Sequence, residues 1–190
     1  GCRLFPSLKD KMTVIYNAKN PGIIRRKAAV TTGDDRIDRP YLLAVERLEE
    51  SQKDLTTLLE AYALLRKTFH REEWLYIIGK GSSEEELKQK ARALGIADRT
   101  VFLGFCANPY PWMLRSRLLV HSAKFEGLPT VLIEGLLLDK LMVATDCPTG
   151  PREILDDGRA GLLVPVGDAA AFASATDRLL NDTQLQADIL

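Results

Sequence analysis

The chain has 190 residues, of which 46% are hydrophobic and 27% charged, and its formal net charge at pH 7 is +0. This length suits a single α/β domain with one buried core. The balanced charge gives no electrostatic reason to expect nucleic acid as a partner, and we expect none. The apolar stretch 131–138 is interrupted by Glu134 and is far too short to span a bilayer.

The cysteines and the start of the chain indicate the compartment. Cys2, Cys106 and Cys147 are odd in number and widely spaced, with no CxxC pair and no histidine cluster. They therefore predict neither a zinc site nor a disulfide framework. No secretory signal pattern opens the chain, so we expect a reducing, cytoplasmic setting.

From residue 41 onward, short apolar runs alternate with longer segments of helical period. The predicted strands are Tyr41–Val45, Trp74–Ile78, Thr100–Leu103, Leu118–His121, Leu141–Thr145 and Gly161–Val164. Six helices are predicted between and after these strands. The first follows Asp54 as its cap, the second runs from Ser83 to a stop at Gly95, and the third is short and lies around Trp112–Arg115. The fourth starts at about Thr130, the fifth covers Pro151–Leu155, and the sixth follows Asp168 as its cap.

Repeated strand–helix units predict a six-stranded, doubly wound parallel sheet of the Rossmann-like α/β class, since parallel strands need crossover connections. Ligands of such sheets bind beyond the carboxyl ends of the strands. The loops of interest therefore follow Val45, Ile78, Leu103, His121 and Thr145.

The first 40 residues do not share this alternation of strands and helices. Thr13–Tyr16 has the composition of a lone strand, and residues 19–40 are polar and irregular. Because a single strand is not stable by itself, this stretch is predicted to belong to a part of the protein that this sequence does not contain. We place a domain boundary here, with residues 1–40 as the end of a preceding domain and its linker and residues 41–190 as the domain proper.

The segment 126–134, EGLPTVLIE, carries the most chemistry. Gly127 lets the backbone approach a ligand closely, and Pro129 suits the first turn of a helix, whose free amides form an anion site. Glu126 precedes this turn, and Glu134 lies about 6 Å further along the helix axis, so both could reach one ligand. In the alternative interpretation Glu126 only favours the helix dipole and Glu134 faces solvent, although a charge within so apolar a helix face argues against it.

Five segments in order resemble the retaining GT-B glycosyltransferases of the "glycosyl transferases group 1" family. Glu126 and Glu134, with seven residues between them, match its E-x7-E motif. Arg47-Leu48 followed by Lys53 resembles GRL-x4-K. The segments 101–105 (VFLGF), 122–127 (SAKFEG) and 161–168 (GLLVPVGD) resemble V-x-F-L-G-F, S-x3-EG and GLLVP-x2-D. The resemblance covers residues 41–180 and implies the C-terminal, donor-binding half of a GT-B fold. Residues 13–17, TVIYN, resemble the last strand of the N-terminal domain and the start of the linker.

The resemblance implies roles around a nucleotide-sugar donor, which is expected to be UDP-linked. Arg47 and Lys53 would hold the diphosphate and stabilise charge as it develops on the leaving nucleotide; in the alternative interpretation they are surface cations. Glu126 would bind sugar hydroxyls and steady a cationic anomeric carbon, and Glu134 would accept hydrogen bonds from the ribose.

Backbone groups complete the implied site. The amides of Thr130 and Val131 would add to the diphosphate clamp, and the turn Gly127, Leu128, Pro129 would follow the donor. Gly104 and Phe105 would border the base, although a phenylalanine there is more often a packing residue. The resemblance also implies front-face attack, in which the donor phosphate itself takes the acceptor's proton, so no general base is demanded of this half. No cofactor is expected.

The two histidines have different expectations. His70 lies near a helix end and is predicted to be solvated. His121 ends a strand beside the proposed site, where we favour core packing over a polar contact to the donor.

The chain also departs from the family pattern. Glu46 replaces a usual glycine beside the clamp, where a carboxylate about 4 Å from a phosphate would cost about 1–4 kcal/mol; either it points away, or donor binding is weakened. Asp139 replaces another glycine in a turn that accepts aspartate. The acidic pairs at 34–35 and 156–157 are predicted to be solvated turns, and no metal site is expected.

Three functions compete on this sequence. The first is transfer of a hexose to a polysaccharide or lipid-linked glycan, with the absent N-terminal domain supplying the acceptor site and a peripheral contact to the inner face of the membrane. The second is a non-catalytic nucleotide-sugar-binding module, for which Glu46 is the best argument. The third, a dinucleotide-binding protein, is disfavoured because no GxGxxG follows the first strand.

Overall fold

The computed structural model describes residues 19–190, so the strand predicted at Thr13–Tyr16 lies outside the described residues. The described chain forms one six-stranded sheet in the order β3-β2-β1-β4-β5-β6, with every pairing parallel. The strands are β1 (Tyr41–Val45), β2 (Trp74–Ile78), β3 (Thr100–Gly104), β4 (Leu118–His121), β5 (Met142–Thr145) and β6 (Leu162–Val164). The predicted doubly wound α/β fold is confirmed.

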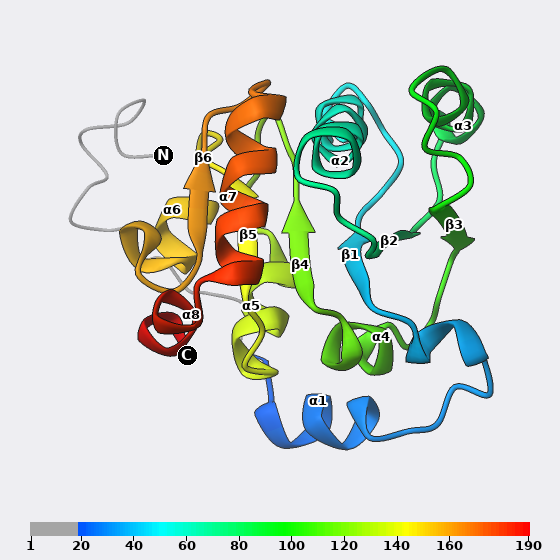
Figure 1. Ribbon diagram of the computed structural model, residues 1–190. Coiled ribbons are helices and arrows are strands. Elements are labelled where there is room, and N and C mark those ends of the chain that lie inside the picture. The colour runs from blue at the N-terminus through cyan, green and yellow to red at the C-terminus, as the bar shows by residue number, and fades with distance from the viewer. Residues whose placement is uncertain (1–18) are drawn as a thin grey trace, which may run out of the picture.

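Helices cover both faces of the sheet (Figure 1). They are α1 (Pro21–Ala28), α2 (Leu55–Thr68), α3 (Glu84–Ala93), α4 (Tyr110–Arg115), α5 (Thr130–Leu137), α6 (Pro151–Ile154), α7 (Ala169–Asn181) and α8 (Thr183–Ile189), with 3-10 turns at η2 (Asp35–Asp38) and η3 (Asp156–Gly158). In Figure 1, α2 and α3 lie toward the top of the view, α7 runs from the top to its middle, and α1 and α4 lie at the bottom.

The two faces have separate apolar cores, which the strand period of two explains. Leu42 and Ala44 of β1 pack into the core beneath α2, α3 and α7, and Tyr41 and Leu43 pack into the core beneath α1, α4 and α5. Because both faces are covered, β1 has four buried residues in succession instead of an alternation.

Residues 19–40 correct one prediction. This segment is not irregular: it forms α1 and η2, which pack on the domain. Asn20 caps α1 by accepting a hydrogen bond from the Ile23 amide at 3.1 Å, and Pro21 occupies the first turn. Ile24 and Ala28, four residues apart, are buried in the same core as α4 and α5. The polar composition concealed a short helix with a narrow apolar face. The domain boundary at residue 40 stays a prediction.

Other helix ends behave as predicted, with one exception. Asp168 caps α7 by accepting from the Ala171 amide at 2.8 Å, and Gly95 follows α3 with φ +70°. Asp54 occupies the cap position of α2, but its side chain makes no capping hydrogen bond within the described residues. The final helix α8 was not predicted.

Gly79 packs closely against the backbone of Glu46 in the loop that follows β1, and substitution of Gly79 tests this contact. A Cβ atom at Gly79 would lie 1.7 Å from the carbonyl oxygen of Glu46, a backbone atom that cannot move aside cheaply. We expect Gly79→Ala to lower the free energy of unfolding by about 3 kcal/mol, the upper range for overpacking. Gly127→Ala is the matched control, because a Cβ there meets nothing within 4 Å. Chemical denaturation measures both, and equal stability of the two variants would contradict the contact.

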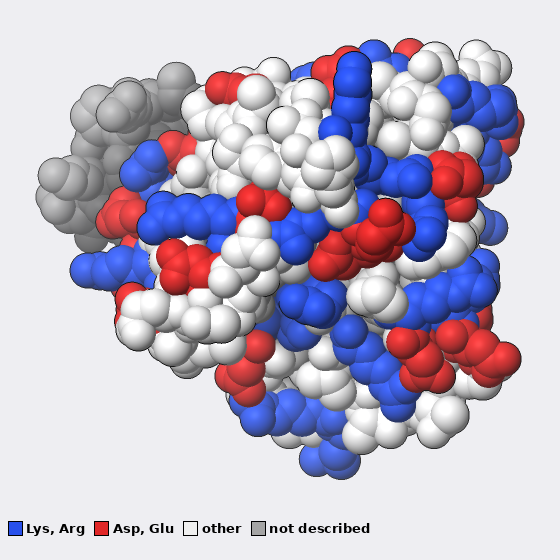
Figure 2. Space-filling model, in the orientation of Figure 1, with Lys and Arg blue, Asp and Glu red and all other residues white. Residues whose placement is uncertain are grey.

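The surface and the helices carry two further observations. On the face seen in Figure 2, Lys and Arg side chains are interspersed with Asp and Glu. Within residues 19–190, no helix combines the length and apolar character that a bilayer crossing requires.

Candidate functional site

The candidate site lies where the strand order reverses, between the carboxyl ends of β1 and β4. In open α/β sheets this switch point is the usual ligand crevice. A pocket of about 190 Å³ opens there, lined by Val45, Glu46, Arg47, Gln52, Lys53, Glu126, Leu128, Pro129, Thr130 and Val131. A second hollow of about 320 Å³ shares the residues 45–47 and extends to Ile78, Gly79, Lys80, Phe105 and Cys106. The loops after β1, β2, β3 and β4 thus meet at one edge, as predicted.

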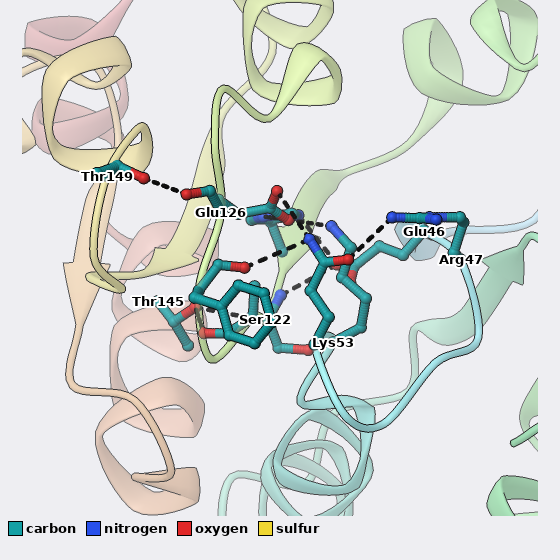
Figure 3. Close-up of polar contacts among 11 residues, drawn as sticks. Glu46, Arg47, Lys53, Ser122, Glu126, Thr145 and Thr149 are labelled. Carbon is teal, nitrogen blue, oxygen red and sulfur yellow. Dashed lines mark hydrogen bonds and ion pairs between the residues drawn. The ribbon is translucent and has the colours of Figure 1, made fainter. Parts of the chain in front are cut away.

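Lys53 and Glu126 form an ion pair at the centre of this crevice (Figure 3). Their side chains are only 10% and 8% exposed. Lys53 directly precedes the cap of α2, and its backbone amide bonds Glu49 O at 2.7 Å. Glu126 is held through its own backbone, with its amide donating to Pro148 O at 3.2 Å and its carbonyl accepting from the Thr149 hydroxyl. The two residues predicted to serve diphosphate and sugar therefore contact each other.

The charge state of Glu126 follows from these neighbours. Burial alone would raise the pKa of Glu126, but the His121 ring and the Lys53 ammonium outweigh it and lower the pKa to about 2. The carboxylate is therefore ionised at every pH at which the protein is expected to work.

Arg47 lies on the exposed rim of the pocket, and its guanidinium donates to Gln52 Oε1 at 2.9 Å. The Gln52 amide in turn donates to Glu126 Oε2 at 3.4 Å. Gln52 thus links Arg47 to Glu126. The sequence pattern did not single this residue out. Nothing in its spacing marks it, because the link forms only when residues 47–53 turn back on themselves.

The start of α5 forms the opposite wall. Leu128, Pro129, Thr130 and Val131 line the pocket, and no side chain of residues 19–190 caps this helix. The Leu132 amide donates to Pro129 O at 3.1 Å, and the amides of Thr130 and Val131 remain available to an anion. Gly127 is exposed, and it does not itself line the pocket.

Glu134 lies outside the lining of this pocket and does not face solvent. It is 9% exposed, and its Oε1 accepts hydrogen bonds from Lys19 Nζ at 2.8 Å and from the Tyr110 hydroxyl at 3.1 Å. Lys19 and Tyr110 were missed by sequence reasoning, because they belong to the segment taken as a linker and to the start of α4. The interpretation of Glu134 as a solvent-facing charge is wrong.

Gly104 and Phe105 end β3 beside the second hollow. Gly104 has φ +72°, and its carbonyl accepts from the Gly79 amide at 2.9 Å. Phe105 lines the hollow and is 72% exposed. The alternative, in which Phe105 is a packing residue, does not hold, and its role at the base stays a prediction.

Glu46 turns its carboxylate inward, away from the exposed rim where Arg47 lies. Its side chain is completely buried, and Oε1 accepts from the Ser122 amide at 3.0 Å. Of the two expectations for this residue, pointing away from the clamp is the one that the geometry supports. His121 Nδ1 lies 3.1 Å from the same oxygen. His121 is thus buried, as core packing requires, but among charges. His70 is exposed, as predicted.

The acidic pairs lie in turns. Asp34 caps η2 and pairs with Arg36, and Asp156 and Asp157 adopt positive φ angles of 51° and 55° in η3, where Asp156 pairs with Arg159. Within residues 19–190, no group of three or more His, Cys, Asp or Glu side chains is arranged to hold a metal ion.

Comparison with known proteins decides the family. The family model described as "Glycosyl transferases group 1" matches residues 39–182. This chain belongs to that family. The match covers all six strands and every residue of the pocket lining described above.

Curated relatives agree with this assignment. The chain is 31% identical over 176 residues to the Campylobacter jejuni N-acetylgalactosamine-N,N'-diacetylbacillosaminyl-diphospho-undecaprenol 4-alpha-N-acetylgalactosaminyltransferase, covering 93% of this chain and 46% of the relative. It is 30% identical over 180 residues to the Rhizobium meliloti lipopolysaccharide core biosynthesis glycosyltransferase LpsE, covering 94% and 50%. The chain thus spans about half the length of these relatives.

Solved structures match in the same partial way. The lipopolysaccharide outer core galactosyltransferase WaaB in its apo form is 27% identical with a TM-score of 0.68, covering 82% of this chain and 46% of that one. The Anabaena protein HepE in complex with UDP-glucose is 24% identical with a TM-score of 0.80, covering 93% and 50%. The latter likeness supports the fold, which is one half of a GT-B glycosyltransferase.

Proposed function

We propose that this chain is the donor-binding half of a hexosyltransferase that takes a UDP-linked sugar and transfers the hexose to a polysaccharide or lipid-linked glycan with retention of configuration. The observation that carries the proposal is the crevice at the β1/β4 switch point. There, Arg47, Lys53 and an uncapped helix start line one pocket. Cations and free amides on two walls are the complement of a diphosphate.

Most of the predicted residues have a place in this proposal; Gly127, which does not line the pocket, has none. Arg47 and Lys53, with the amides of Thr130 and Val131, bind the diphosphate and stabilise its charge as the bond to the sugar breaks. Glu126 contacts the sugar hydroxyls and the cationic anomeric carbon. Glu134 accepts hydrogen bonds from the ribose hydroxyls, which replace its present contacts with Lys19 and Tyr110. The hollow beside Gly104 and Phe105 takes the base.

We propose retention of configuration on the strength of the family resemblance. We propose front-face attack, in which the acceptor oxygen forms the new glycosidic bond as the bond to the diphosphate breaks, and a donor phosphate oxygen takes the acceptor's proton. No metal ion or other cofactor is needed for this transfer. The paired Glu126 carboxylate stabilises positive charge at the anomeric carbon and does not act as the base.

The partial coverage of the relatives supports a second part of the proposal. The absent N-terminal domain supplies the acceptor site and places the protein in the cytoplasm at the inner face of a membrane. The chain by itself is therefore expected to bind nucleotide and to show negligible transfer. Robust turnover by the 190-residue chain alone would overturn this division of labour.

Arg47 gives the first test of the clamp. The guanidinium lies on the rim, where solvent screens it, so we expect Arg47→Ala to weaken UDP binding by about tenfold, the lower range for a charge-assisted hydrogen bond. Isothermal titration calorimetry of the chain with UDP measures this. Arg66→Ala is the control, because Arg66 pairs with Asp98 away from the pocket. Failure of the wild-type chain to bind UDP would remove the proposed function itself.

A non-catalytic nucleotide-sugar-binding module is the second candidate. Glu46 in place of the family's glycine is the residue that favours it, although its carboxylate turns away from the clamp to Ser122 and His121. Measurement of hexose transfer or donor hydrolysis by the full-length protein separates the two functions. UDP binding without either reaction would establish the module.

A further inference from the structure

A buried cluster of charges lies directly behind the pocket. His121, at the end of β4, has a side chain that is 2% exposed, and its two ring nitrogens face two carboxylates. Nδ1 lies 3.1 Å from Glu46 Oε1, and Nε2 lies 3.4 Å from Glu126 Oε1. Lys53 contacts that same oxygen of Glu126 from the other side. A histidine between two carboxylates is unexplained by the proposed binding roles alone.

The two carboxylates that face the ring favour a proton on His121. With a neutral ring, the two buried carboxylates would share Lys53 as their one cationic neighbour within residues 19–190, and an uncompensated buried charge is costly. Burial alone would lower the pKa of His121, but Glu46 first and Glu126 second outweigh it and raise the pKa above 6.5. Lys53 opposes this rise. The nearby Cys147 thiol adds no charge, because burial raises its pKa to about 11.

The Glu46 end of the cluster is rigid. The Glu46 amide bonds Ile78 O at 2.9 Å, and its carboxylate accepts from the Ser122 amide at 3.0 Å, so two strands fix it. The backbone beside His121 is equally fixed, because the Ala123 amide donates to the Thr145 hydroxyl at 2.8 Å and the Ala123 carbonyl accepts from it at 2.9 Å. Glu126, by contrast, lies on a loop.

At the Glu126 end the backbone is held by Pro148 and Thr149, but the side-chain contact with His121 is longer. At 3.4 Å, His121 Nε2 and Glu126 lie within ion-pair distance, but the described residues leave both ring nitrogens without an aligned hydrogen bond. Lys53 cannot give its full charge to Glu126 and to a diphosphate at the same time. When a diphosphate draws Lys53 away, His121 is the cation that remains beside Glu126.

We propose that His121 is a positioning residue: as an imidazolium anchored on Glu46, it holds the Glu126 carboxylate against the donor sugar while Lys53 turns to the diphosphate. This inference rests on the proposed function, because it concerns the same site. It also gives Glu46 a role, since the carboxylate that departs from the family pattern keeps the proton on His121. The pair acts on Glu126 and does not contact the donor.

A pH dependence follows, with its sign set by the histidine. The protonated ring is present below the raised pKa of His121 and is lost as the pH rises through it. Transfer should therefore decline at alkaline pH, while UDP binding, which uses Arg47, Lys53 and amides, declines less. Glu46→Gln keeps the size and an acceptor for Ser122 but removes the charge, so it should move the decline to lower pH.

Two experiments test the proposal. Transfer or hydrolysis by the full-length protein is followed with the fastest of UDP-glucose, UDP-galactose and their N-acetyl forms. His121→Gln should lower kcat by about 10-fold to 100-fold, as for displaced supporting groups, with UDP affinity changed less than about threefold. His70→Gln changes the other histidine of the chain, which is exposed, and should leave kcat and UDP affinity unchanged. His121→Asn replaces His121→Gln if the latter does not fold, and UDP binding reports folding.

The second experiment observes the proton itself. Nuclear magnetic resonance of the 190-residue chain resolves two imidazole signals, and His70→Gln assigns them. His121 should titrate above pH 6.5, and Glu46→Gln should lower that midpoint. A neutral His121 ring at pH 6.5, or a variant at 121 with wild-type kcat and pH profile, would overturn the proposal. Such an outcome with UDP still bound would leave the proposed function standing.

Discussion

Replacing Lys53 by alanine is expected to weaken UDP binding by about 10-fold to 100-fold, the value of a hydrogen bond between charged groups. Lys53 is the buried cation of the pocket, only 10% exposed in its side chain, so solvent screens it far less than it screens Arg47. The loss should therefore exceed that of Arg47→Ala. Isothermal titration calorimetry of the chain with UDP measures both values under one set of conditions.

Lys124→Ala is the matched control for Lys53→Ala. Lys124 is also a lysine of the crevice region, but it is exposed and donates to the Glu50 carbonyl at 2.6 Å. Its removal should leave UDP affinity within about twofold, as for a surface charge. Equal affinity of the Lys53 variant and wild type would remove Lys53 from the diphosphate site and leave it as a structural partner of Glu126.

The ion pair between Lys53 and Glu126 also predicts coupling. Diphosphate and carboxylate compete for one ammonium, so removing the carboxylate frees Lys53 for the nucleotide. In a double-mutant cycle, Lys53→Ala should therefore cost more UDP affinity in a Glu126→Gln background than in wild type. Additive effects would show that Lys53 does not exchange between the two partners.

The fold could be predicted from the sequence because its determinants are local. A strand buried on both faces is a continuous apolar run such as Tyr41–Val45, and a crossover helix carries apolar residues at three and four, such as those of Leu55–Thr68. The segment α1 escaped because its apolar face consists of Ile24 and Ala28 alone, too few to dominate eight residues with three basic side chains.

The site was predicted less completely, for a physical reason. Motif spacing located Arg47, Lys53 and the start of α5, and these lie around one pocket. Spacing cannot show which charges pair across the sheet, because Lys53 and Glu126 are 73 positions apart and Glu134 and Lys19 are 115 apart. The inward turn of Glu46 depends on the Ser122 amide and His121, two contacts that only the folded chain brings together.

Glu126→Gln in the full-length protein is expected to reduce hexose transfer by about 100-fold to 1000-fold, the loss typical of a group that stabilises charge in a transition state. The amide keeps the size of the side chain but not its negative charge, which is what a cationic anomeric carbon requires. UDP affinity should stay equal or increase, because Lys53 loses its competing partner. Initial rates with a saturating UDP-sugar, together with UDP titrations, measure the two effects.

Acid should not mimic this substitution, because the pKa of Glu126 is held near 2. The depressed pKa means that the carboxylate contributes stability above its unfolded value of 4.5, and that this contribution is lost only as the pH falls toward about 2. Between pH 5 and 7, wild-type transfer should therefore show no decline that follows Glu126. Glu85→Gln is the control, since Glu85 is exposed and pairs with Lys88 on α3. A Glu126→Gln protein with wild-type kcat would mean that this carboxylate only anchors Lys53, and the charge that assists bond cleavage would then have to come from the absent domain.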